Sequence, residues 1–70
     1  MNGNELIKKS GALGRLRNVP VRFDARRGKG SHGSLYFGAR RATIKDRKAE
    51  IGRGLLADML RQLGIGKDDL

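Results

Sequence analysis

The chain contains no cysteine and no tryptophan, and it has one proline, one histidine, one tyrosine and two phenylalanines. The absence of cysteine excludes a disulfide framework and thiolate metal sites, and a single histidine leaves little for any other metal centre. We therefore predict neither a metal nor a cofactor. No apolar run approaches the roughly 20 residues that a membrane-spanning helix needs, and residues 1–5 are too polar to begin a signal peptide. We expect a cytoplasmic protein without a membrane contact.

Acidic residues are also scarce in this sequence. Seven Asp and Glu stand against sixteen Lys and Arg, which gives a net charge of +9 at neutral pH. A basic excess of this size on a small domain is typical of a protein that binds a polyanion, most often nucleic acid. Composition leaves one alternative open, namely a basic solvated surface with no specific partner.

The length of 70 residues allows a single domain over residues 1–70. A chain of this size buries only about 60% of the surface that it exposes when unfolded. We therefore expect a thin core of two layers. A deep, enclosed pocket does not fit such a core, so any functional site should lie on an open surface and suit an extended polymer.

The N-terminal third of the chain has the spacing of an amphipathic helix over residues 4–17, with Asn4 as the expected N-cap. Gly11 and Gly14 lie inside this segment, where each glycine costs roughly 1 kcal/mol relative to alanine. These two glycines mark either close packing or an early end of the helix. The apolar stripe of the helix comprises Leu6, Ile7, Ser10, Leu13 and Leu16.

The middle of the chain alternates apolar and polar residues in three segments, which predicts strands at 19–24, 31–37 and 41–46. Glycines in residues 26–30 favour a turn after the first strand, and residues 38–40 form a second turn. Strands joined by short turns form an antiparallel meander. The polar face of this meander carries Arg22, Asp24, Arg26, His32, Ser34, Tyr36, Arg41, Thr43 and Lys45.

A second amphipathic helix is predicted over residues 54–63, followed by Gly64 at the position after a helix end. Residues 67–70 form a polar tail that we expect to be frayed. The predicted fold is therefore α+β, in the order α-β-β-β-α, with a three-stranded antiparallel sheet, both helices on one face and an ordered core over about 4–66. The apolar stripe of the second helix comprises Leu55, Leu56, Met59, Leu60 and Leu63.

His32 is the residue that brings chemistry to the open polar face of the predicted sheet. Imidazole titrates near neutrality and can take a proton from the ribose 2′-hydroxyl, which then attacks the adjacent phosphorus. Fixed cations stabilise the charge that builds on the phosphorane. A solvent-exposed strand histidine without function is the alternative. The predicted RNA contacts are Arg26, Arg27, Lys29, Gly30, Ser31, Tyr36, Arg41 and Lys45.

The segment from Gly28 to His32, the strand ending in Tyr36-Phe37 and the helix that ends in Leu-Gly-Ile at 63–65 resemble the HicA toxins. The resemblance covers about residues 4–66. It implies a fold similar to double-stranded-RNA-binding domains and a type II toxin that cleaves mRNA as a ribosome-independent endoribonuclease. It also implies that His32 is catalytic and that a cognate HicB antitoxin neutralises the protein. Leu55 departs from the family pattern, because many members have threonine there.

Two further interpretations remain open from the sequence. A non-catalytic RNA-binding module would use the same fold to read RNA shape, with His32 incidental. A weaker alternative is a basic protein that binds ribosomal RNA.

Overall fold

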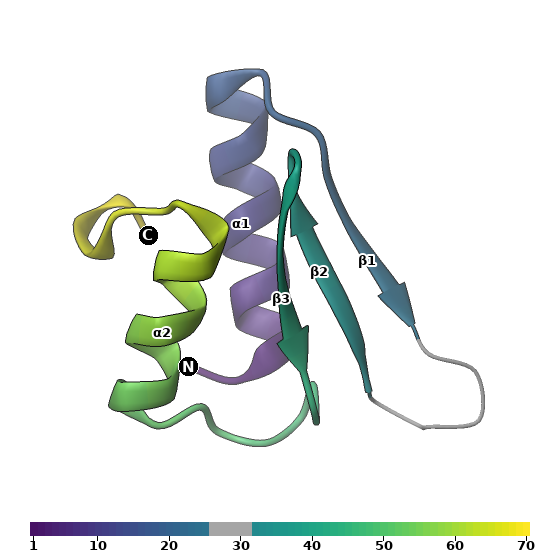
Figure 1. Cartoon of the computed structure of the whole chain (residues 1–70), viewed down its shortest axis with the longest axis vertical. Coiled ribbons are helices and arrows are strands. Elements are labelled where there is room, and N and C mark those ends of the chain that lie inside the picture. The colour runs from purple at the N-terminus through teal and green to yellow at the C-terminus, as the bar shows by residue number, and fades with distance from the viewer. Residues whose placement is uncertain (26–31) are drawn as a thin grey trace.

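The computed structural model describes residues 1–25 and 32–70. Two helices and a three-stranded sheet follow one another in the order α-β-β-β-α, so the predicted α+β fold is confirmed (Figure 1). The turn predicted at 26–30 lies outside the described residues. The elements are α1 (Gly3–Arg17), β1 (Val21–Ala25), β2 (Gly33–Phe37), β3 (Arg40–Ile44), α2 (Arg53–Leu63) and a short 3₁₀ helix, η1 (Lys67–Asp69).

The sheet is the antiparallel meander that the alternation predicts, with β2 in the centre between β1 and β3. Its first strand begins at Val21, two residues later than predicted. Pro20 has no N–H for the ladder, and the N–H of Val19 donates instead to the carbonyl of Gly14 at 2.8 Å. The predicted turn at residues 38–40 is tight, and Gly38 has a φ of 61° there.

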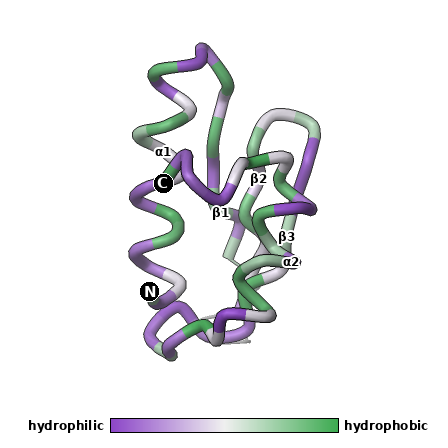
Figure 2. The backbone as a smooth tube through the Cα atoms, turned by 90° about the vertical axis from the view of Figure 1, so that its left-hand side faces the viewer, coloured by the Kyte–Doolittle hydropathy of each residue, from purple (hydrophilic) through white to green (hydrophobic). Residues whose placement is uncertain are grey.

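Both helices cover the same face of the sheet, as predicted (Figure 1). The covered face is apolar, whereas the opposite face carries the polar partners of the alternation. In Figure 2 the apolar stretches of the sheet and of α2 lie next to one another. The buried apolar core comprises Leu6, Leu13, Leu35, Phe37, Ala42, Ile44, Ile51, Met59, Leu60, Leu63 and Ile65.

The cap of α1 is Asn2, so the prediction of Asn4 is wrong. The side chain of Asn2 accepts a hydrogen bond from the N–H of Glu5 at 2.9 Å, and the Glu5 carboxylate accepts one from the N–H of Asn2 at 3.0 Å. This reciprocal capping box needs an acceptor side chain three residues before Glu or Gln. Asn2 meets that spacing, whereas three residues beyond Asn4 the chain has Ile7.

Two leucines of the predicted apolar stripes are exposed. Leu16 is 83% exposed, because the buried side of α1 follows Ser10, Leu13 and Gly14 and ends before it. Leu55 is 57% exposed on the first turn of α2. The stripes are therefore narrower than the spacing of the leucines predicts.

The C-terminal segment, which the sequence predicts to be a frayed tail, packs back on α1 and on the core. Gly64 ends α2 with a φ of 71°, which confirms its predicted role. Beyond it, the Asp69 carboxylate contacts the guanidinium of Arg17 at 3.0 Å and accepts a hydrogen bond from the N–H of Gly66 at 2.9 Å. Leu70 packs against the core. No helix among the described residues is long and apolar enough to cross a membrane.

Candidate nucleic-acid interface

The structure describes four of the nine predicted site residues. They are His32, Tyr36, Arg41 and Lys45, all contributed by β2, β3 or the residues directly beside them. The others lie outside the described residues. These are Arg26, Arg27, Lys29, Gly30 and Ser31.

The register of the sheet sets the polar side chains of the open face in cross-strand rows. Tyr36 pairs with Arg22 on one side and with Arg41 on the other. Side chains of directly paired residues lie within about 5.5 Å of one another at their Cβ atoms. One row of the open face is thus an aromatic ring between two guanidinium groups. The next row comprises Asp24, Ser34 and Thr43.

Tyr36 is held by its neighbour on β1. The guanidinium carbon of Arg22 lies 4.2 Å from the centroid of the Tyr36 ring. Arg22 also approaches the Asp24 carboxylate at 3.9 Å, but both side chains are more than half exposed, so this ion pair adds little stability. The stacked guanidinium occupies one face of the phenol ring, so a base could stack only on the other.

His32 opens onto a hollow in the sheet face with a volume of about 340 Å³. Arg41 lines the same hollow, so His32 and Arg41 border one open space. The hollow is open, as expected for so thin a core. Its lining residues are Asp24, Ala25, His32, Gly33, Ser34, Arg41 and Thr43.

The position of His32 is fixed by the residue that follows it. Gly33 is buried and pairs with Ala25, and the Phe23 ring packs against its Cα. A Cβ at residue 33 would lie 2.5 Å from Cζ of Phe23 and 2.6 Å from the carbonyl oxygen of Asp24. Only glycine fits there without displacing β1. The inner-face contact with Phe23 therefore fixes the backbone directly after the half-buried His32.

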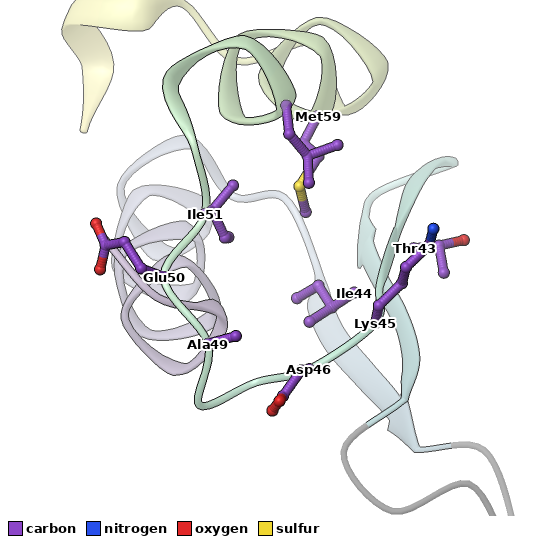
Figure 3. A pocket seen from close by; sticks show the side chains of 9 residues that line it. Thr43, Ile44, Lys45, Asp46, Ala49, Glu50, Ile51 and Met59 are labelled. Carbon is purple, nitrogen blue, oxygen red and sulfur yellow. The ribbon is translucent and has the colours of Figure 1, made fainter.

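Lys45 is not among the described residues that line this hollow. It lines a second hollow, of about 170 Å³, between the end of β3 and the start of α2 (Figure 3). The floor of that hollow includes Ile44, Ile51 and Met59. His32 and Arg41 thus line one hollow and Lys45 lines another, and Thr43 lines both.

Three polar residues of the His32 hollow were placed on the open face by the sequence but not proposed as site residues. They are Asp24, Ser34 and Thr43, which form one cross-strand row beside His32. The signal that could identify them is the register of two hairpins, because it sets which polar residues pair. Asp24 makes the β1 side of the hollow acidic, so an anion is favoured on the β3 side, next to Arg41.

The described hollow offers a base, a guanidinium, two hydroxyls and one carboxylate. Among residues 1–25 and 32–70, no group of three His, Cys, Asp or Glu side chains gathers as a metal site would require. Comparisons of the chain with models of protein families, with curated proteins and with solved structures find no match.

Proposed function

We propose that the protein is an endoribonuclease that cleaves mRNA without a metal ion and uses His32 as its catalytic residue. The observation that carries the proposal is the shared hollow of His32 and Arg41 on the cationic open face of the sheet. A general base and a phosphate-binding group in one accessible place suit an extended RNA strand. The resemblance to the HicA toxins supports the same activity and the cytoplasm as its location.

The proposed reaction uses the nucleophile that RNA itself provides. His32 takes the proton of the 2′-hydroxyl, the 2′-oxygen bonds to phosphorus, and the bond from phosphorus to the 5′-oxygen breaks. The products are a 2′,3′-cyclic phosphate and a 5′-hydroxyl, which receives the proton from the imidazolium or from water. Arg41 donates N–H groups to the non-bridging oxygens, where charge grows in the transition state.

Tyr36 and Arg22 form the binding part of the proposed site. The free face of the Tyr36 ring can stack a base, which is worth about 1–3 kcal/mol in single-strand binding. Arg22 would then contact phosphate at the edge of the same row. Because DNA lacks the 2′-hydroxyl, a DNA strand of the same sequence can occupy this surface but cannot be cleaved.

The proposed partner is an antitoxin protein of the HicB type that covers the open face. A cationic surface around a nuclease site has to be closed in the resting cell, and carboxylates facing Arg22 and Arg41 would do so. Charge reversal at these two arginines should slow association with the antitoxin more than it speeds dissociation, because long-range attraction acts mainly on association.

The deciding experiment is incubation of the purified protein with single-stranded RNA and with DNA of the same sequence, each in EDTA. The proposal expects RNA cleavage that leaves cyclic phosphate ends and intact DNA. Activity that disappears in EDTA and returns with Mg²⁺ would contradict it. RNA binding without cleavage would favour the non-catalytic RNA-binding module, for which the row of Arg22, Tyr36 and Arg41 suffices.

A further inference from the structure

The helix layer carries a groove that the proposed nuclease does not use. It runs along α2 on the side that faces η1, and two adjoining hollows of about 360 and 410 Å³ make it up. Both hollows are lined by Ala57, Leu60 and Lys67, so they form one continuous surface. In Figure 1 this part of the molecule lies on the far side of α2 from the sheet.

The floor of this α2–η1 groove is apolar. Leu56, Leu60 and Ile65 line it, and Ala57 lies exposed between them. On α2 the lining residues are 53, 56, 57, 60 and 61, with the spacing of one helix face. That face is about 12 Å long at 1.5 Å per residue. A partner helix of two to three turns can lie along a face of this length.

The rim of the groove is cationic. Arg53 stands at one end, Lys67 at the side formed by η1, and Arg61 at the other end. Arg61 is partly neutralised by Asp58, at 3.4 Å. Within the described part of the chain, neither Arg53 nor Lys67 lies within 4.0 Å of a carboxylate. The rim therefore presents two cations to an incoming ligand.

The residues that line the groove favour an acidic peptide helix over RNA as its ligand. RNA binds through phosphates and through bases stacked on aromatic rings, but no aromatic residue lines this groove. An apolar floor contributes nothing to a phosphate. An amphipathic peptide helix, in contrast, buries leucine-like side chains on the floor and sets carboxylates against the rim.

We infer that the α2–η1 groove is a docking site for an acidic amphipathic helix of a protein partner. The site lies away from His32, so a docked partner would leave the sheet face free. The inference does not depend on RNA cleavage and stands on the floor and rim of the groove alone. The groove is thus a second protein-binding site, separate from the open face of the sheet.

The test uses the full-length protein and a fluorescent synthetic peptide. The peptide forms an amphipathic helix with leucines at i, i+3, i+4 and i+7 and with glutamates beside them; a second peptide has lysine in place of each glutamate. We expect the glutamate peptide to bind and the lysine peptide not to bind. Amide NMR signals of α2 and η1 should shift, whereas those of β2 should not.

Matched variants locate the binding. Arg53→Glu with Lys67→Glu should weaken the glutamate peptide about tenfold, which corresponds to about 1.4 kcal/mol. Lys8→Glu with Lys9→Glu makes the same change of net charge on the exposed face of α1 and should leave affinity within twofold. Ala57→Trp keeps the charge but fills the groove, and it should abolish binding of the glutamate peptide.

Three outcomes would overturn the inference. The first is no binding of the glutamate peptide to the unaltered protein, and the second is an equal loss in the α1 and rim variants. The third is that rim reversal weakens an RNA oligonucleotide and not the peptide, which would make the groove an RNA surface. RNA cleavage measured on the rim variants keeps the two proposals separate, because this inference expects it to be unchanged.

Discussion

The two faces of the sheet are made by the same three strands but obey different constraints. On the inner face, Leu35 and Ala42 are cross-strand partners, and both are almost completely buried. On the open face, the row of Arg22, Tyr36 and Arg41 is exposed or half-buried and is held by one cation–π contact. Inner-face residues are therefore constrained by the volume of the core, and open-face residues, under the proposed function, by the RNA that they contact. Substitutions on the two faces should separate stability from activity.

His32→Ala should show the largest effect on activity and little effect on stability. Loss of a general base typically slows a reaction by about 10² to 10⁴, whereas a surface change usually alters stability by no more than about 0.5 kcal/mol. RNA affinity should persist, because it rests on Arg and Lys contacts to phosphate. Cleavage rate, thermal midpoint and RNA binding are measured together. A variant that cleaves within twofold of the unaltered protein would remove His32 from the catalytic role.

Leu35→Ala should show the opposite pattern, with a large loss of stability that comes from the core and not from the candidate site. Leu35 is 0% exposed in the central strand, and truncation of a buried leucine costs about 2–5 kcal/mol. Urea unfolding measures the loss. Ser34→Ala, one residue away on the open face, is the matched control and should stay within about 0.5 kcal/mol. Equal losses in the two variants would mean that the two faces are not distinct.

Gly14→Ala and Gly11→Ala should move stability in opposite directions. A Cβ on Gly14 would lie 2.6 Å from the carbonyl oxygen of Val19 and would collide with the Val21 side chain. Outside the helix's own backbone, no atom of the described residues lies within 4 Å of a Cβ on Gly11. Overpacking costs about 1–3 kcal/mol, and removing an unneeded helix glycine gains about 0.5–1 kcal/mol. Thermal unfolding of both variants checks the signs. A stabilising Gly14→Ala would show that α1 does not approach β1 closely.

Ser10→Ala should stabilise the protein by about 1 kcal/mol. Ser10 is 0% exposed on the covered side of α1, and its hydroxyl has no hydrogen-bond partner among the described residues. A buried polar group without a partner costs about 1–3 kcal/mol, and the small void left by the oxygen offsets part of the gain. Chemical denaturation provides the measurement. A loss of stability would reveal a partner for the hydroxyl, for example a backbone carbonyl of α1.

Asp69→Asn should have the smallest effect and one that depends on pH. The side-chain hydrogen bond from Arg17, followed by the N–H of Gly66, holds the pKa of Asp69 below its ordinary value of 3.8. A lowered pKa in the folded state stabilises the fold above pH 3.8, and this contribution is lost as pH falls through the folded-state pKa. The difference in thermal midpoint between the two proteins should therefore shrink as the solution is acidified below that value. A difference that stays constant with pH would rule out the charge of Asp69 as its cause.

The fold was predictable because alternation and helical spacing are strong local signals in this chain. Leu35 and Phe37 lie inside, and Ser34 and Tyr36 face the open side, as their alternation indicates. Element ends were less predictable, since they depend on tertiary contacts. The N–H of Asn4, for example, donates to the carbonyl of Arg47 at 2.9 Å, and no local pattern reveals that contact.

The sequence predicts which face of the sheet carries the candidate site, but it does not predict which hollow each residue of that face lines. Alternation put His32, Arg41 and Lys45 on the same face of the sheet. Their distribution between two hollows depends on where β3 ends, at Ile44, and on the path of the chain toward α2. Asp24 lines the hollow because the register of the β1–β2 hairpin pairs it with Ser34, and the alternation of one strand does not reveal that register. The alternation within each strand identifies the open face, whereas the register between strands determines which residues of that face are neighbours.

The connectivity of the sheet also sets the order in which the chain can fold. Each strand pairs with its neighbour in sequence, so both hairpins close over short loops, and such local pairing favours rapid folding. α1 packs on the inner face of β1 and β2, whereas α2 covers β3 and supplies Met59, Leu60 and Leu63 to the core. During synthesis, α2 leaves the ribosome after the strands. We therefore expect the three-stranded sheet, and with it the proposed site on its open face, to become stable once α2 can dock on β3.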